Sequence, residues 1–180
     1  WTCISGRLGL KLRSNQSIEY NINDIMRSIL LGCDSLDVLD SLIGEIVNNE
    51  YYRIHFIGIG YSNIPCMYIH DKLDELDYRV SIKSPLDYNM KEPSIVIFIS
   101  ESGETSDLIF IAKRCKSMNC KLYAITSQSN SNLAKTVKNH IVIKKGRGNI
   151  TNEKPDYFIS NTMTLMESIL TIITNTGKRG

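Results

Sequence analysis

The stretch of sequence that decides the fold is residues 95–106, which read IVIFISESGETS. The first five residues are all apolar, which is typical of a strand buried on both faces of a sheet. Three hydroxyl residues, Ser100, Ser102 and Thr105, then surround Gly103, and apolar residues at helical spacing begin a few positions later. The sequence therefore predicts a central strand that ends in a hydroxyl-rich turn and leads into a helix.

The same alternation of strand and helix extends in both directions from this stretch. Short apolar runs predict further strands at 53–58, 79–83, 121–125 and 141–143. Apolar residues at three- and four-residue spacing predict helices near 64–73, 108–118, 131–137 and 158–174, and two more at 22–31 and 36–48. Strands joined by helical crossovers form parallel sheets that are covered on both faces, so we expect an α/β sandwich.

Length and charge restrict the kinds of protein that this chain can be. Its 180 residues suit one domain, and a formal net charge of +2 provides no cationic excess for coating a nucleic acid. The longest apolar runs are a strand long and fall short of the ~20 residues that cross a bilayer. We therefore expect a globular protein without a membrane span.

The cysteine pattern indicates the cellular compartment, and the motifs for nucleotide binding indicate which cofactors to expect. The chain has 5 cysteines without CxxC pairs, and its start does not resemble a signal peptide, so we expect a reduced, cytoplasmic protein without a metal site. It has no GxxxxGK[ST] motif for a nucleoside triphosphate, and we expect no cofactor. Cys115 and Cys120 flank a predicted helix end, and we interpret them as small apolar residues rather than a redox pair.

Two turns between a strand and a helix carry residue types that bind anions. Residues 58–63 read GIGYSN, and these glycines let the backbone approach a ligand closely. In the turn at 100–106, several hydroxyls stand at the start of a helix, where N–H groups attract phosphate. A structural interpretation is also open, because a GxG pair is a weak motif and Ser62 or Thr105 could simply cap a helix. Capping accounts for one hydroxyl of the second turn, and the others favour a site for a phosphorylated metabolite.

These turns, together with a third motif, resemble the SIS (sugar isomerase) domain. The motifs are FIGIGYS at 56–62, FISESGET at 98–105, and AIT at 124–126 followed by SNLAK at 131–135. The resemblance covers about residues 36–175 and leaves residues 1–35 as an N-terminal arm and linker helix. It implies a three-layer α/β/α sandwich with a flavodoxin-like, five-stranded parallel sheet, preceded by N-terminal helices, that binds a phosphosugar.

The resemblance also implies which residues bind the ligand, a sugar monophosphate. The hydroxyls of the 100–105 loop would hold the phosphate. The glycine turn with Ser62 would line the sugar side, and Ser127 would reach the same pocket. The complete set of expected ligand-binding residues is Gly58, Gly60, Ser62, Ser100, Ser102, Gly103, Thr105 and Ser127.

Two branches of this family differ in what the domain does. In RpiR-type transcriptional regulators it senses a sugar phosphate and follows a DNA-binding domain and a helical linker, which residues 22–49 resemble. In 6-phospho-3-hexuloisomerase the glycine turn usually carries Arg before the Ser, and a catalytic His lies near the C-terminus. Tyr61 stands at the Arg position here, and no His follows His140. The sequence therefore favours an effector sensor whose DNA contacts lie in a domain upstream of Trp1, with a sugar-phosphate isomerase as the alternative.

An isomerase would need a base that moves a proton between adjacent carbons. The candidates are Glu104 in the second turn, Glu167 on the last helix and His70 after the glycine turn. Each has an ordinary interpretation as well, because carboxylates near helix N-termini often only balance the dipole, and charged helix residues are often only solvated. The sequence leaves the catalytic residues unassigned.

The predicted helices carry more apolar surface than a five-stranded sheet can cover. Those at 22–31, 36–48 and 158–174 each have a broad apolar stripe, and part of it should stay uncovered in a monomer. We therefore expect a homo-oligomer, a dimer or a tetramer, that forms through the N-terminal helices and the last helix.

Overall fold

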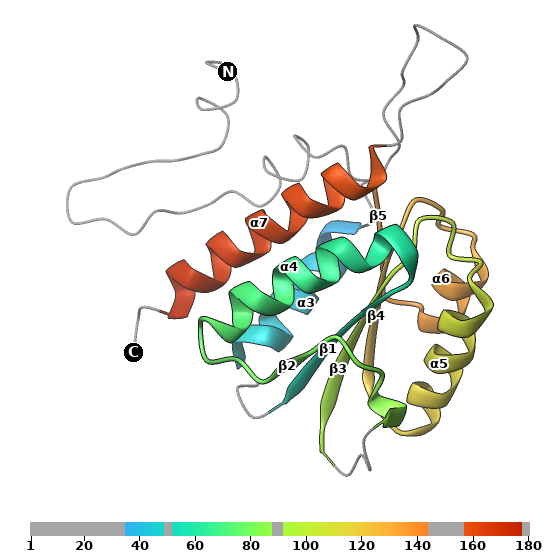
Figure 1. The fold of residues 1–180 in the computed structure, drawn as a ribbon, viewed down its shortest axis with the longest axis horizontal. Coiled ribbons are helices and arrows are strands. Elements are labelled where there is room, and N and C mark those ends of the chain that lie inside the picture. The colour runs from blue at the N-terminus through green and yellow to red at the C-terminus, as the bar shows by residue number, and fades with distance from the viewer. Residues whose placement is uncertain (1–34, 49–51, 88–91, 144–156, 178–180) are drawn as a thin grey trace, which may run out of the picture.

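A computed structural model describes residues 35–48, 52–87, 92–143 and 157–177 (Figure 1). In chain order the elements are α3 (Leu36–Asn48), β1 (Arg53–Gly58), the short helix η2 (Gly60–Ser62), α4 (Asn63–Asp74), β2 (Val80–Ser81), the short helix η3 (Pro85–Asp87), β3 (Ser94–Ile99), α5 (Ser106–Ser117), β4 (Lys121–Thr126), α6 (Asn132–Val137), β5 (His140–Val142) and α7 (Phe158–Gly177). Each strand and helix expected from residue 36 onward is present. The helix expected at 22–31 lies outside the described residues.

The strands form one parallel sheet in the order β2-β1-β3-β4-β5. This is the strand order of a doubly wound, flavodoxin-like sheet, which confirms the expected fold class. β1 and β3 pair along their whole length, from Arg53 opposite Ser94 to Gly58 opposite Ile99.

The strand expected at 79–83 is shorter in the structure, because β2 contains only residues 80–81. The backbone of Lys83 bonds to side chains instead of to a neighbouring strand. Its N–H donates to Ser81 Oγ at 3.1 Å, and its carbonyl oxygen lies 2.9 Å from His55 Nδ1. These bonds turn the chain away from the sheet and toward η3.

Helices cover both faces of the sheet (Figure 1). The helices α3, α4 and α7 pack on one face, and α5 and α6 pack on the other. The six residues of β3 are all buried, and their alternation decides which layer each one contacts. Ile95, Ile97 and Ile99 join the cluster under α3, α4 and α7, whereas Val96 and Phe98 join the cluster under α5 and α6. The apolar run at 95–99 is thus a strand with two buried faces.

The long helix α7 is amphipathic and covers the sheet with one side only. Its apolar residues Leu165, Met166 and Ile169 are buried in the core. On its outer side, Thr164 and Ser168 donate hydrogen bonds to carbonyl groups four residues earlier. Among the described residues, none of the helices combines the length and the apolar character that a bilayer crossing requires.

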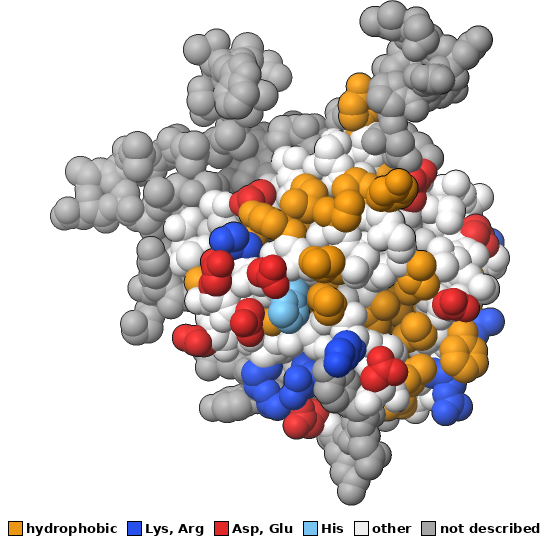
Figure 2. All heavy atoms as spheres, viewed as in Figure 1, with side chains coloured by type: hydrophobic (Ala, Val, Ile, Leu, Met, Phe, Trp, Pro, Cys, Tyr) orange, Lys and Arg blue, Asp and Glu red, His pale blue; other side chains and the backbone are white. Residues whose placement is uncertain are grey.

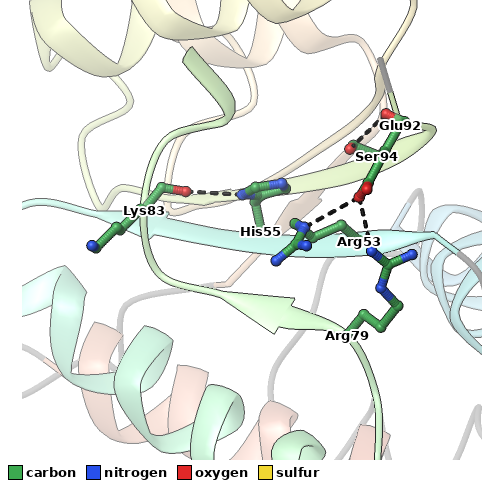
Figure 3. A network of polar contacts seen from close by, with 6 residues as sticks. All are labelled: Arg53, His55, Arg79, Lys83, Glu92 and Ser94. Atoms are coloured by element: carbon green, nitrogen blue, oxygen red, sulfur yellow. Dashed lines mark hydrogen bonds and ion pairs between the residues drawn. The ribbon is translucent and has the colours of Figure 1, made fainter. Parts of the chain in front are cut away.

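A polar network near the amino ends of the strands ties β1 to the segments beside it (Figure 3). The Glu92 carboxylate lies 3.5 Å from Arg53 Nε and 3.0 Å from Arg79 Nη2. His55 in β1 is buried, and its Nδ1 donates to the Lys83 carbonyl, because a carbonyl oxygen can only accept. His55 thereby fastens the chain after β2 to the middle of the sheet.

We predict that His55 makes the domain less stable as the pH falls below about 6.5, the ordinary pKa of histidine. Burial lowers the pKa of His55, the hydrogen bond to Lys83 opposes this shift, and the charge of Arg53 lowers the pKa further. Below its ordinary pKa the unfolded chain binds a proton that the folded chain binds less well, so the free energy of unfolding rises with pH in that range and levels off above it. Urea unfolding of the wild type and of His55→Asn from about pH 5 to 8 measures this, because Asn keeps a donor for Lys83 without titrating.

The same substitution at His70, a residue of α4 outside the network, is the matched control. We expect the wild type and His70→Asn to lose stability in parallel on acidification, and His55→Asn to lose less. Identical pH profiles for all three proteins would rule out His55 as the source of the effect.

Candidate functional site

Parallel pairing brings the ends of three strands to one edge of the sheet, called here the carboxyl edge. Gly58 at the end of β1 lies opposite Ile99 at the end of β3, and Ile99 also lies opposite Ile125 in β4. The turns at 59–63, 100–105 and 127–131 consequently meet at this edge, where doubly wound sheets bind their ligands. The structure places all eight expected ligand-binding residues at this edge.

The loop at 100–105 is organised by its own hydroxyl groups. Ser100 Oγ accepts from the Gly103 N–H at 3.2 Å, and Ser102 Oγ accepts from the Glu104 N–H at 3.2 Å. Ser100 Oγ also lies 3.4 Å from Thr105 Oγ1. Ser100 is buried and Ser102 is exposed, so the hydroxyls extend from the base of the loop to its surface. A hydroxyl that accepts one bond still has its proton, and Ser102 can donate that proton to a ligand.

Gly103 allows the loop to pack against the start of α6. Its φ of +65° lies in the left-handed region, which favours glycine. A β-carbon at this position would lie 2.6 Å from Ser131 Cβ. The Gly103 carbonyl accepts from the Leu133 N–H at 3.0 Å. The backbone angle and the contact with Ser131 therefore both require glycine here.

A second set of hydrogen bonds holds the loop to the end of β4. The Glu101 carbonyl accepts from Thr126 Oγ1 at 3.0 Å, from Ser127 Oγ at 2.8 Å and from the Ser127 N–H at 2.9 Å. The Ser127 hydroxyl thus positions the loop and uses its proton for this purpose. Its oxygen lone pairs are the part that can accept from a ligand.

The glycine turn after β1 is compact because α4 begins directly on top of the strand end. A β-carbon at Gly58 would lie 2.6 Å from the carbonyl carbon of Ser62. Gly60 has a φ of +63°, but the space around it is open. Ser62 occupies the N-cap position of α4 without a side-chain capping bond, and Tyr61 is 82 % exposed. The turn therefore presents the Ser62 hydroxyl and an open space beside Gly60.

The two helices that begin beside the 100–105 loop use their first N–H groups differently. At α6, the N–H groups of residues 132–134 donate to Glu104, Gly103 and Ser131. At α5, Thr105 holds the N-cap position, but its side chain makes no capping hydrogen bond to the described residues. The structure therefore does not support Thr105 as a simple cap. The positive end of α5, rather than that of α6, faces the hydroxyls as a site for an anion.

Glu104 belongs to the loop, but its carboxylate is engaged by α6. It accepts from the Asn132 N–H at 2.9 Å and from Asn132 Nδ2 at 2.6 Å. The backbone bond, with the side-chain bond second, lowers the pKa of Glu104. A carboxylate with a lowered pKa is a weaker base. In this geometry Glu104 holds α6 against the loop.

The structure does not bring Glu167 or His70 to the 100–105 loop. Glu167, in the middle of α7, accepts a hydrogen bond from Tyr68 Oη and lines a groove of about 260 Å³ between α4 and α7. His70 Nδ1 lies 2.9 Å from Asp71 Oδ1. At about 1.5 Å of rise per residue, His70 is about 10 Å along α4 from the glycine turn. Of the three candidate bases, only Glu104 is part of the loop.

Ser131 and Asn132 support the site, although the sequence analysis gave them no role. Ser131 is 1 % exposed, accepts from the Ala134 N–H at 3.3 Å and contacts Gly103 through the close packing described above. A serine directly before a helical run is a capping signal, so this role could have been predicted. The pairing of Asn132 with Glu104 had no such signal, because it depends on how two separate turns pack.

The fold and the site together define a class of protein. It is a doubly wound α/β domain with a cluster of hydroxyls and a helix N-terminus at the carboxyl edge, where such folds bind their ligands. In the described part of the chain, no three His, Cys, Asp or Glu side chains are grouped to hold a metal ion. The family model for the SIS domain matches residues 46–167. The chain belongs to the SIS domain family, as its motifs predicted.

Similar sequences include an aminotransferase and an uncharacterized protein. Glutamine–fructose-6-phosphate aminotransferase (isomerizing) of Campylobacter jejuni is 27 % identical over an alignment of 135 residues, and the alignment covers 71 % of this chain and 22 % of that protein. The chain thus spans about a fifth of the length of this relative. An uncharacterized protein of Archaeoglobus fulgidus is 29 % identical over 105 residues, with 57 % of each protein covered.

Similar solved structures include a protein with an inferred isomerase function and a domain of a transcription factor. A Methanococcus jannaschii protein, with an inferred function of 3-hexulose-6-phosphate isomerase, has a TM-score of 0.68 at 21 % identity and 88 % coverage of both chains. The sugar isomerase domain of an RpiR transcription factor from Sphaerobacter thermophilus has a TM-score of 0.64 at 16 % identity, with 86 % of this chain and 83 % of that chain covered. The Vibrio vulnificus NanR protein in complex with ManNAc-6P has a TM-score of 0.64 at 16 % identity, with 86 % and 60 % covered. At these identities the likeness establishes the fold.

We predict that Gly103→Ala destabilises the domain more than Gly60→Ala does. Both glycines have a positive φ, and an alanine in that region costs about 1–2 kcal/mol. Only the new methyl group at position 103 meets another side chain, which adds about 1–3 kcal/mol for overpacking. Urea unfolding of both variants measures the difference in stability. Equal losses would contradict the prediction, because they would mean that Ser131 moves away from the new methyl group at no cost in free energy.

Proposed function

We propose that this domain binds a sugar monophosphate with the phosphate in the 100–105 loop. The observation that supports this most is the cluster of hydroxyls from Ser100, Ser102 and Thr105 at the start of α5. Hydroxyl protons and helix N–H groups satisfy phosphate oxygens, and the dipole of α5 favours their negative charge. Because none of these groups carries a full charge, the ligand can dissociate and rebind as its concentration changes.

In this proposal the sugar lies toward the glycine turn. The space beside Gly60 is open, and the Ser62 hydroxyl is not used for capping α4. Gly58 keeps this turn close to the strand end, and Ser127 offers an acceptor from the other side of the loop. These residues suit hydrogen bonds with the hydroxyl groups of a sugar.

We further propose that the domain is the effector sensor of an RpiR-type transcriptional regulator. A sensor needs to bind its ligand but does not need to move a proton within it. The engagement of Glu104 by Asn132 favours binding over catalysis, because the base nearest to the phosphate loop has a structural role. The likeness to an RpiR domain and to NanR with its sugar phosphate gives further support. DNA would be contacted by a separate domain.

A second candidate function is the isomerisation of an aldose phosphate and a ketose phosphate. The structural likeness to the Methanococcus jannaschii protein with an inferred isomerase function favours this candidate. The exposed Tyr61 at the position of the usual arginine counts against it. We therefore place it second.

We also propose that the protein is cytoplasmic and forms a dimer or a tetramer. The apolar stripes of α3 and α7, which the sequence analysis expected to stay partly uncovered, are packed into the core. Large apolar side chains remain exposed on the adjacent side of α4, where Ile64 and Met67 are each 49 % exposed. Figure 2 shows hydrophobic side chains on the face that α4 and α7 present. We place the subunit contact on α4 and its glycine turn.

We predict that removing the phosphate weakens ligand binding more than changing the sugar does. Calorimetry with hexose, pentose and amino-sugar phosphates, each beside its unphosphorylated form, measures this. Ser102→Ala should cost about 1–3 kcal/mol of binding free energy, because it removes a hydrogen bond to a charged group. Ser117→Ala is the matched control, since its hydroxyl bonds to the Arg114 carbonyl at the other end of α5. Equal binding of glucose and glucose 6-phosphate would contradict the assignment of the loop.

We predict that the domain has little or no isomerase activity on hexulose 6-phosphate. The physical reason is that Glu104, the one candidate base in the loop, is bonded to Asn132 and has a lowered pKa. A coupled spectrophotometric assay measures the turnover. A rate of ~1 s⁻¹ or more would make the domain an enzyme. Glu104→Gln and Glu167→Gln would then identify the base.

A further inference from the structure

The helix α5 ends in a Schellman motif, a defined hydrogen-bonded turn. The Cys120 N–H donates to the Cys115 carbonyl at 3.2 Å, and the Asn119 N–H donates to the Lys116 carbonyl at 3.3 Å. Asn119, the second of these donors, has a φ of +58°. These two bonds around a left-handed residue define the motif, and they lead the chain directly into β4.

In a Schellman motif the side chains at the two ends of the longer bond meet, usually in an apolar contact. Both positions are cysteines here. Cys115 is fully buried between α5 and the sheet, and Cys120 is half-buried beside it. The hydrogen bond between the two thiols raises the pKa of Cys115 and lowers the pKa of Cys120. Cys120 is therefore the more acidic thiol of the two.

Cys66 has a different environment, which makes it a natural comparison within the chain. It is buried in α4, its thiol donates to the Ser62 carbonyl at 3.3 Å, and burial raises its pKa to about 12. Thiolates react and thiols do not, so a buried cysteine of this kind is inert. Of the three cysteines that the structure describes, only Cys120 combines partial exposure with a lowered pKa.

We propose that Cys115 and Cys120 are a reversible redox pair that closes into a disulfide across the end of α5. The Schellman bonds hold the two residues together, and Cys120 packs against the buried cluster to which Cys115 belongs. This revises the interpretation of the two cysteines as merely apolar residues. The sequence had shown that they flank a helix end, but it had not shown that the turn pairs them.

The chemistry requires a two-electron oxidant, for which we name a hydroperoxide. The Cys120 thiolate attacks one peroxide oxygen, the O–O bond breaks, and a sulfenic acid forms on Cys120 while the other oxygen leaves as water or an alcohol. The Cys115 sulfur then attacks the Cys120 sulfur, the S–O bond breaks, and the Cys115 proton leaves with the hydroxide as water. Two thiols are oxidised to one disulfide, and the peroxide is reduced. A dithiol reductant reverses the reaction.

The pair is separate from the proposed ligand site. The 100–105 loop lies at the start of α5, which is 12 residues long, and Cys115 lies in the last turn of this helix. A disulfide would join the last turn of α5 to the residue before β4 and would fix the position of that end of the helix. Oxidation of the pair therefore does not depend on whether the loop binds a sugar phosphate.

The experiment treats the reduced full chain with equimolar hydrogen peroxide, alkylates the remaining thiols and digests the protein with trypsin. Trypsin cuts after Lys116 and Lys121, so a disulfide would join the two peptides Cys115–Lys116 and Ser117–Lys121. We expect mass spectrometry to detect this linked species and expect dithiothreitol to separate it. The Cys66 peptide should stay alkylated under the same conditions.

Two variants separate the steps of the reaction. Cys115→Ala should stop the reaction at the sulfenic acid, which dimedone traps on Cys120, and Cys120→Ser should leave Cys115 unoxidised. Oxidation of Met118 within the same peptide adds an oxygen and no linkage, so the spectrum distinguishes it. Irreversible oxidation of Cys120 without the linked peptides, linkage to a different cysteine, or no reaction at either thiol would overturn the proposal.

Discussion

Burial of β3 on both of its faces is the constraint on which the other features depend. A strand with no solvated side needs a pairing partner at each edge and a helical layer above and below, and here these are β1, β4 and the two groups of helices. Parallel neighbours require crossovers, and crossovers bring each strand back in the same direction. The hydroxyl loop, the glycine turn and the start of α6 therefore lie at one edge of the sheet, because β1, β3 and β4 all run in the same direction.

The candidate site is built mainly from bonds within and between turns. Glu101 is held by the end of β4, and Gly103 and Glu104 are held by the start of α6. Only a few groups are left to meet a ligand, chiefly the Ser102 hydroxyl and the positive end of α5. The division is chemical: the Glu101 and Gly103 carbonyls and the Glu104 carboxylate, which repel anions, accept internal bonds, while the exposed Ser102 hydroxyl keeps its proton for a ligand.

Much of the fold from residue 36 onward could be predicted, because apolar residues repeat at different intervals in strands and helices. The end of β2 could not be predicted, because it depends on hydrogen bonds that join Ser81 and His55 to the backbone of Lys83. The motifs identified the 100–105 loop, but the pairing of Glu104 with Asn132 across 28 positions exists only after the turns have packed. The spacing of residues in the sequence therefore predicts the strands and helices and the residue types in the turns. It does not show which polar groups form hydrogen bonds with one another.

The attachment of the 100–105 loop to α6 and β4 also has a consequence for a ligand that binds there. These bonds order the loop before any ligand binds. Binding therefore carries no free-energy cost for ordering the loop, and the affinity depends on the contacts between ligand and protein. The same stiffness prevents the loop from absorbing a displacement locally. A ligand that moves Gly103 by a fraction of an ångström moves Ser131 with it, so the loop and the first turn of α6 shift as one rigid body.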